Sequence, residues 1–135
     1  DGGIRGAAPL YVKSHSQGEY MFDYGWADAF ERAGGQYYPK LQLAVPFTPV
    51  TGPRLLARDD QEQAMNRELA LAGCVEVASQ LEVSSLHITF LTESEWKQCG
   101  QSGLLQRTGE QFHWLNNGYA TFDEFLSDLT SRKRK

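Results

Sequence analysis

The sequence has few cysteines and no long apolar run among its 135 residues. Cys74 and Cys99 fit no C-x-x-C spacing, which argues against a disulfide framework or a cysteine metal site and favours a reducing, cytoplasmic location. The longest apolar run, Leu69–Val75, has seven residues, whereas a helix that crosses a membrane needs about 20. We therefore expect no membrane span, and the opening residues lack the order of a signal peptide.

The common phosphate-binding and nucleophile motifs are also missing. The sequence contains neither G-x-G-x-x-G nor G-x-x-x-x-G-K-[ST], and the acetyltransferase cofactor loop [RQ]-x-x-G-x-[GA] is absent as well. The hydrolase pattern G-x-S-x-G does not occur either. These residues therefore predict no bound cofactor.

The composition is that of one soluble domain spanning residues 1–135. Apolar residues make up 41% and charged residues 22%, and a chain of this size buries about two-thirds of its unfolded surface. The net charge is −4, but the last four residues carry four positive charges, so the remaining 131 carry a net −8. Because an acidic body repels nucleic acid and the tail is short, nucleic acid is not an expected general partner.

Periodicity predicts an α+β fold with a mixed, mostly antiparallel sheet flanked by helices. Three helices carry apolar stripes at helical spacing, at 26–33, 60–81 and 122–131, and a capping box at Thr92 predicts a short fourth helix ending near Gly100. Alternating or extended segments predict strands near 4–12, 40–45, 86–91, 104–107 and 111–116, the last two as a hairpin. The stripe of the longest helix contains Leu71, Cys74, Val75, Ala78 and Leu81, so we expect Cys74 to be buried.

The three histidines predict no metal site. His15, His87 and His113 have no i, i+4 partner among themselves and no cysteine or carboxylate at ligand spacing. His87 and His113 each lie in a predicted strand and face away from its apolar residues. Both would then line one groove on the far face of the sheet, as ligand-binding groups or as surface histidines.

Two segments interleave aromatic and polar side chains. Residues 15–26 and 111–119 have the character of small-molecule or peptide recognition surfaces, and equally of the rim of a core. Ser14, His15 and Ser16, with Glu19 and Asp23 nearby, contain the residue types of a hydrolase triad. Such triads are assembled from separate elements, so a loop with local hydrogen bonds is the favoured interpretation.

Several strings of the sequence together resemble one known family, the FemAB-like family of N-acyltransferases connected with peptidoglycan biosynthesis. These strings are PLYVKSHSQGEY (9–20), YYPKL (37–41), VPFTPVTGPRLL (45–56), SLHITFL (85–91), QFHWLNNGY (111–119) and FDEFLSDLTSRKRK (122–135). The resemblance extends over essentially the whole chain and corresponds to the N-terminal part of the family.

The resemblance implies a GNAT-type fold, duplicated in the full protein, with this chain as the substrate-binding half. It implies transfer of an acyl or aminoacyl group to a small-molecule or peptide amine, with coenzyme A or transfer RNA carrying the donor in the full protein. By position in the matching strings, the catalytic candidates are His15, Glu19, His87 and His113. The candidates for substrate binding are Lys13, Ser16, Tyr20, Trp26, Lys40, Arg54, Gln111, Trp114 and Asn116.

The ends of the chain carry a further expectation. The opening Asp1-Gly2-Gly3 has the chemistry of a hairpin turn, and no glycine or proline follows Leu129 to stop the last helix. We expect a GNAT-like domain that is incomplete at both ends, inactive alone, and partnered by a C-terminal acyltransferase half or by a second copy of itself. The alternatives are a non-catalytic binding domain of the same fold and a nucleic-acid accessory domain that uses the basic tail.

Overall fold

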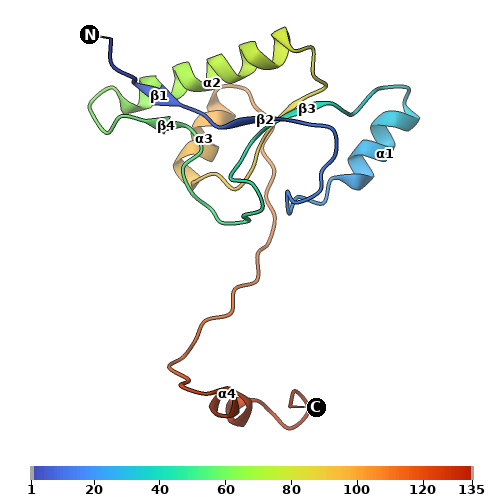
Figure 1. Ribbon diagram of the computed structural model, residues 1–135, viewed down its shortest axis with the longest axis vertical. Helices are drawn as coiled ribbons and strands as arrows, with labels where there is room; N and C mark the ends of the chain where they lie inside the picture. The colour runs from blue at the N-terminus through green and yellow to red at the C-terminus, as the bar shows by residue number, and fades with distance from the viewer. Residues whose placement is uncertain (1, 135) are drawn as a thin grey trace.

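The computed structural model describes residues 2–134 and has a mixed α+β architecture (Figure 1). The helices are α1 (Tyr24–Arg32), α2 (Gln63–Gln80), α3 (Glu93–Gln101) and α4 (Phe122–Asp128). The strands are β1 (Gly6–Ala7), β2 (Leu10–Lys13), β3 (Lys40–Leu43), β4 (Leu56–Ala57) and β5 (Leu86–Ile88). Asp1 of the expected opening turn and Lys135 of the basic tail lie outside the described residues.

The strands form two small sheets where the sequence predicted one. β1 and β4 pair antiparallel, and β2, β3 and β5 form a three-stranded sheet in that order. β2 runs antiparallel to β3, with Lys13 opposite Lys40, whereas β5 runs parallel to it, with His87 opposite Gln42. The expected strand at 4–12 divides into β1 and β2 around Pro9, which has no N–H to donate to a ladder.

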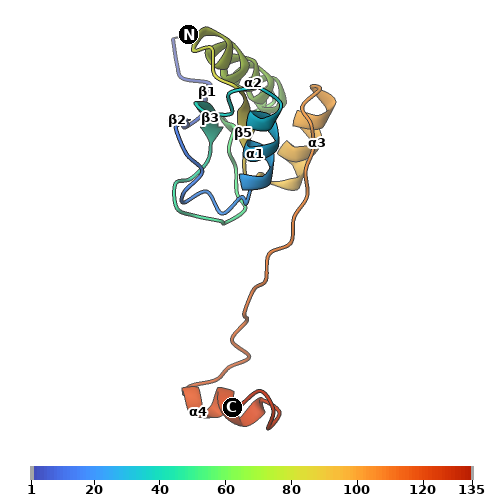
Figure 2. The same ribbon diagram turned by 90° about the vertical axis from the view of Figure 1, so that its right-hand side faces the viewer.

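The apolar core lies between the sheets and helices α2 and α3. Its buried residues are Leu43, Leu55, Leu71, Cys74 and Cys99. Partly buried apolar side chains from β2, β5 and the loops pack around them. Figure 2 shows the helices arranged around the small sheets in the upper body. The prediction that Cys74 is a buried core residue is confirmed, since only 2% of it is exposed.

Local capping explains where two helices begin. The Thr92 side chain accepts from the Glu95 N–H, and the Glu95 carboxylate accepts from the Thr92 N–H, so the predicted capping box of α3 is confirmed. At α4 the Thr121 side chain accepts from the Glu124 N–H. The longest helix begins later than the predicted residue 60: Asp60 accepts from the Glu62 N–H, and α2 begins at Gln63 without a side-chain cap.

The predicted hairpin at 104–107 and 111–116 was wrong. The described residues form no strand there; the chain runs as an extended, exposed arm that leaves the body and ends in α4 (Figures 1 and 2). Leu105 is 99% exposed and Phe112 is 95% exposed. An isolated hairpin is at best marginally stable in water, and here no sheet lies beside it to supply a third strand.

Two of the predicted helix stripes were also partly wrong. On α1 only Ala27 is buried, and Trp26 and Phe30 are 59% and 46% exposed. On α2 Leu71 and Cys74 are buried, but Val75 and Leu81 are about half exposed. Periodicity identifies an apolar face, but whether a neighbour covers that face depends on tertiary packing.

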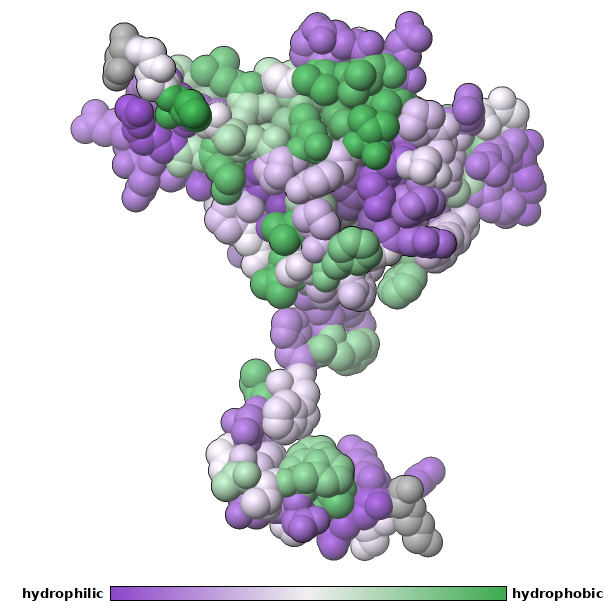
Figure 3. Space-filling view, in the orientation of Figure 1, coloured by the Kyte–Doolittle hydropathy of each residue, from purple (hydrophilic) through white to green (hydrophobic). Residues whose placement is uncertain are grey.

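The C-terminal helix forms a small lobe of its own. Trp114, Tyr119 and Phe122 pack against the ring of Phe125, with centroid distances of 5.7–5.8 Å. Figure 3 shows the thin neck that joins this lobe to the body. No helix among residues 2–134 combines the length and hydropathy needed to cross a bilayer.

Burial predicts that both cysteines react slowly. Burial raises the pKa of the Cys74 thiol and of the Cys99 thiol, so little reactive thiolate forms. We expect both to resist a thiol reagent in the native protein and to react at once after denaturation. An Ala72→Cys variant, whose new thiol lies on the exposed face of α2, supplies the fast-reacting control. Rapid labelling of Cys74 without unfolding would contradict the core described above.

Candidate functional site

The central strand β3 is buried on both of its faces. Leu41 and Leu43 are 1% and 0% exposed, and Lys40 and Gln42, on the opposite face, are 0% and 2% exposed. The sequence predicted a half-buried strand with its polar face in water. Instead the loop of residues 14–23, between β2 and α1, covers that face. A polar interior on one side of the sheet is the structural origin of the site.

A buried ammonium group forms the centre of the site. The Lys40 Nζ atom donates to three side-chain oxygens: Ser16 Oγ at 2.8 Å, Glu19 Oε2 at 2.7 Å and Asp23 Oδ2 at 2.6 Å. The two carboxylates are themselves buried, with side chains 3% and 4% exposed. A charge removed from water needs such partners, and Lys40 has one for each of its three protons.

Further polar side chains form hydrogen bonds with the two carboxylates. Tyr37 OH donates to Asp23 Oδ2 at 2.8 Å. The Gln42 amide nitrogen donates to both Glu19 oxygens at 2.7 Å, in the amide orientation that also lets Gln42 Oε1 accept from Thr89 Oγ1. Lys13 Nζ lies 3.8 Å from Glu19 Oε1, with its side chain 22% exposed. The cluster of Lys13, Glu19, Asp23 and Lys40 is therefore neutral as a whole.

The hydrogen bonds decide the protonation state of the cluster. Burial alone would raise the pKa of Asp23, but donors on Lys40, Ser16 and Tyr37 outweigh it and hold this pKa below its usual value. Burial and the neighbouring Asp23 carboxylate raise the pKa of Tyr37, so its hydroxyl keeps its proton. At neutral pH Asp23 is therefore a carboxylate, and Tyr37 is a phenol that donates to it.

His87 lies on the same face of the sheet, beside this cluster. Its Nε2 atom lies 2.9 Å from Ser85 Oγ, and its ring packs edge-on against the Tyr37 ring at 6.0 Å between centroids. Burial lowers the pKa of His87, and the positive charge of Lys40 lowers it further. The imidazole is therefore neutral at pH 7 and has a lone pair available for a proton.

Two tight contacts hold the loops around the site. Gly18 has φ of +76°, and a Cβ atom there would lie 2.4 Å from the Phe47 ring, so the 14–23 loop can press against Phe47 only with glycine at this position. Arg54 is 2% exposed and donates to the carbonyls of Val50, Gly52, Pro53 and Thr89. These four hydrogen bonds hold the loop of residues 47–54 in an ordered conformation.

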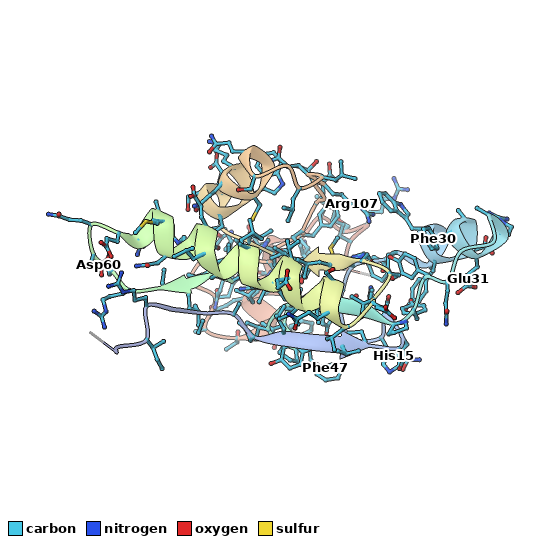
Figure 4. The ribbon with its side chains drawn as sticks, turned by 90° about the horizontal axis from the view of Figure 1, so that it is seen from above. His15, Phe30, Glu31, Phe47, Asp60 and Arg107 are labelled. Atoms are coloured by element: carbon cyan, nitrogen blue, oxygen red, sulfur yellow. The ribbon has the colours of Figure 1, made fainter. Side chains whose placement is uncertain are left out.

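Five of the predicted site residues meet at this cluster. They are Lys13, Ser16, Glu19, Lys40 and His87. Two more predicted residues lie at its margin: His15 is exposed beside the β2 edge (Figure 4), and Tyr20 is 51% exposed in the covering loop. Trp26 lies under the Arg107 guanidinium at 5.2 Å from the ring centroid, and Figure 4 shows Arg107 beyond the opposite edge of the sheet.

The remaining predicted residues lie elsewhere. The Arg54 guanidinium donates to backbone carbonyls, so it stabilises the loop that contains it. Gln111 donates to the Pro49 carbonyl, and Trp114 and Asn116 belong to the C-terminal lobe. His113 is exposed in the arm, so the predicted groove shared by His87 and His113 is not formed. The reason is the absent hairpin, which would have placed His113 in the sheet.

The predicted site residues did not include Asp23, Tyr37, Gln42 and Ser85, and Asp23 was considered only as the acid of a hydrolase triad that was not favoured. Strand alternation gave a usable signal for two of them, since Gln42 shares a face with Lys40 and Ser85 shares one with His87. Asp23 and Tyr37 could be found only from the pairing of distant segments. Among the described residues no group of three or more His, Cys, Asp or Glu side chains is placed to hold a metal ion.

A surface hollow lies away from the Lys40 cluster. It has a volume of about 500 Å³ and belongs to the C-terminal lobe, where Trp114, Asn116, Tyr119, Thr121, Phe122 and Phe125 line it. Its walls are the aromatic rings that pack on Phe125. The charged site is thus a covered sheet face that opens only at its edges, near Lys13 and His87.

Fold and site together define an α+β domain with a charged cluster on one face of its central strand. The model of the FemAB-like family, described as peptidoglycan biosynthesis/recognition, matches residues 1–135. The chain belongs to this family, and at the family level this implies a transferase function related to peptidoglycan. No curated protein and no solved structure matches the chain.

Removing the buried ammonium should destabilise the fold strongly. In a Lys40→Met variant Glu19 and Asp23 stay buried without their counterion, and we expect the free energy of unfolding to fall by about 3–5 kcal/mol. The matched control is Lys97→Met, which removes an exposed ion pair with Glu93 and is expected to change the stability little. Adding Asp23→Asn to Lys40→Met should recover part of the loss. Equal unfolding midpoints for Lys40→Met and Lys97→Met would contradict a charge-centred site.

The neutral state of His87 predicts a pH dependence of stability. Its folded pKa lies below the unfolded value of 6.5, so the unfolded chain binds more protons, and stability falls as pH drops below 6.5. We expect His87→Gln to remove part of the stability loss between about pH 6.5 and 5. An NMR titration of the His87 ring protons checks the cause directly, and a midpoint at or above 6.5 would refute it.

Proposed function

We propose that this chain is the substrate-binding part of a GNAT-like transferase that moves an acyl or aminoacyl group onto an amine. The observation that carries the proposal is the neutral His87 imidazole beside the buried Lys40 cluster, in a chain that belongs to a family of peptidoglycan biosynthesis. The two free cysteines fit a cytoplasmic site of action.

Transfer of an acyl group to an amine depends mainly on a general base and on holding the two reactants in the right orientation. An ammonium acceptor must lose a proton before its nitrogen attacks the donor carbonyl, and a neutral imidazole at pH 7 is suited to take it. The C–N bond forms, the thioester or ester bond of the donor breaks, and the leaving thiol or hydroxyl receives a proton. Holding both reactants against one rigid sheet face supplies the rest of the acceleration.

The edges of the cluster offer groups for a peptide-like substrate. Lys13 is partly exposed at the β2 edge and presents a positive charge for a carboxylate. On the other side Trp26 is 59% exposed, with Arg107 stacked on its ring, which gives a flat apolar surface next to a cation. His15 and Glu19 are proposed here as further polar contacts, with acyl-CoA or aminoacyl-tRNA as the donor.

A non-catalytic binding domain is the second candidate. The family description includes recognition, and the charges of Lys40, Glu19 and Asp23 are largely satisfied by one another. In that case the same edges would bind the peptide without transferring anything to it. The exposed arm and the C-terminal lobe are, in either case, a proposed contact surface for a second acyltransferase half or for another copy of this chain.

The test combines binding with transfer. We would titrate the isotopically labelled chain with UDP-N-acetylmuramoyl pentapeptide and follow the backbone amides of Lys13, Ser16 and His87 by NMR. We expect shifts that saturate at these positions, and an affinity at least about tenfold weaker in Trp26→Ala, equivalent to about 1.4 kcal/mol. Tyr24→Ala, which changes an equally exposed aromatic residue of α1, is the matched control.

Mass spectrometry of the same precursor after adding acetyl-CoA or aminoacyl-tRNA then separates the two candidates. A mass increase on the amine supports the transferase, and binding without any increase supports the binding domain. If the precursor does not bind and no amine is modified, both candidates fail.

A further inference from the structure

A serine and a histidine form a close pair at the start of β5. Ser85 Oγ lies 2.9 Å from His87 Nε2, within hydrogen-bond reach. Because strand side chains alternate, residues two apart share a face, so both point toward the face that carries Lys40 and Gln42. In the parallel register Leu86 pairs with Leu41, which places Ser85 level with Lys40 on the neighbouring strand.

The histidine of this pair is held in place by the ionic cluster. Its ring packs edge-on against Tyr37, at an interplanar angle of 82°, and Tyr37 is fixed by its hydrogen bond to Asp23. With the imidazole neutral, Nε2 accepts when the Ser85 hydroxyl donates, and the ring proton is then on Nδ1. A nucleophile, a neutral base within reach and a third group that orients the base are the parts of an activated serine.

The pair is placed where another molecule can reach it. β5 is an edge strand of its sheet, and Ser85 and His87 are only partly buried. The positive charges of Lys40 and Arg107 and the negative charge of Asp23 all act electrostatically on His87. Among residues 2–134, no other serine side chain forms a hydrogen bond with a histidine ring nitrogen.

We propose that Ser85 is a nucleophile that carries the acyl group between donor and acceptor, with His87 as its base. Ser85 Oγ attacks the donor carbonyl carbon, a C–O bond forms, and the thioester or ester bond of the donor breaks. The serine proton passes to His87 Nε2 and from there to the leaving thiolate or alkoxide. The amine then attacks the seryl ester, a C–N bond replaces the C–O bond, and a proton from the amine returns through His87 to Ser85.

This inference rests on the proposed function for the identity of the donor and acceptor, but its test needs neither. A fluorophosphonate probe reacts with activated serines, as the serine oxygen bonds to phosphorus and fluoride leaves. We would label the native chain, weigh it intact and map the modified peptide. We expect one label, on Ser85, with the labelling rate about 10²-fold lower in His87→Gln and falling as pH drops through the His87 titration.

A serine remote from the pair supplies the matched control. Ser79→Ala removes an exposed hydroxyl of α2 and should leave labelling within about twofold, whereas Ser85→Ala should abolish it. Thermal unfolding of each variant checks folding, and the site map on the unmodified chain decides the question even if a variant fails to fold. No label on the native chain, a label on Ser84 or elsewhere, or labelling that survives Ser85→Ala overturns the proposal.

The outcome of the probe experiment can be distinguished from the outcome of the transfer assay. If the chain modifies the amine but the probe does not label Ser85, the seryl intermediate is refuted. Direct transfer from the donor to the amine is then the remaining mechanism. A labelled Ser85 in a chain that neither binds nor modifies the precursor refutes the peptidoglycan acceptor and keeps the activated serine.

Discussion

The structure depends on one buried ammonium group. Lys40 is fully buried in the central strand, and an isolated charge there would cost far more than a domain of this size could tolerate. It is stable only because Ser16, Glu19 and Asp23 are brought to it by a loop that is distant in sequence. The closed position of residues 14–23, and with it the covered face of the sheet, follows from the need to neutralise this charge.

The two faces of β3 have different roles in the domain. On one side Leu43 joins Leu55, Leu71 and the two cysteines in the apolar core that supplies most of the stability. On the other side Lys40 and Gln42 organise charges and hydrogen bonds. The apolar side fixes the backbone of β3, and the polar side chains on its other face are positioned by their hydrogen bonds to one another.

The polar face also accounts for the chemistry proposed for the chain. Its ionic centre is saturated, and its reactive groups lie at the margin, where His87 is neutral and Ser85 lies against it. Tyr37 connects the two zones, since its hydroxyl binds Asp23 and its ring orients His87. In this chain a fixed charge network thus positions the His87 imidazole at the edge of the sheet.

The sequence by itself determined the elements with strong local signals. The capping box at Thr92 predicts α3, the alternation around His87 predicts β5, and the apolar neighbours of Cys74 predict its burial; all three are confirmed. Membership of the family also followed from the sequence, because its strings extend along the whole chain. Tertiary structure alone decided that the polar face of β3 is covered, that Asp23 and Tyr37 complete the site, and that 104–116 has no sheet to join. These outcomes depend on contacts between segments far apart in the chain, and local periodicity contains no information about which distant surface will cover a given face.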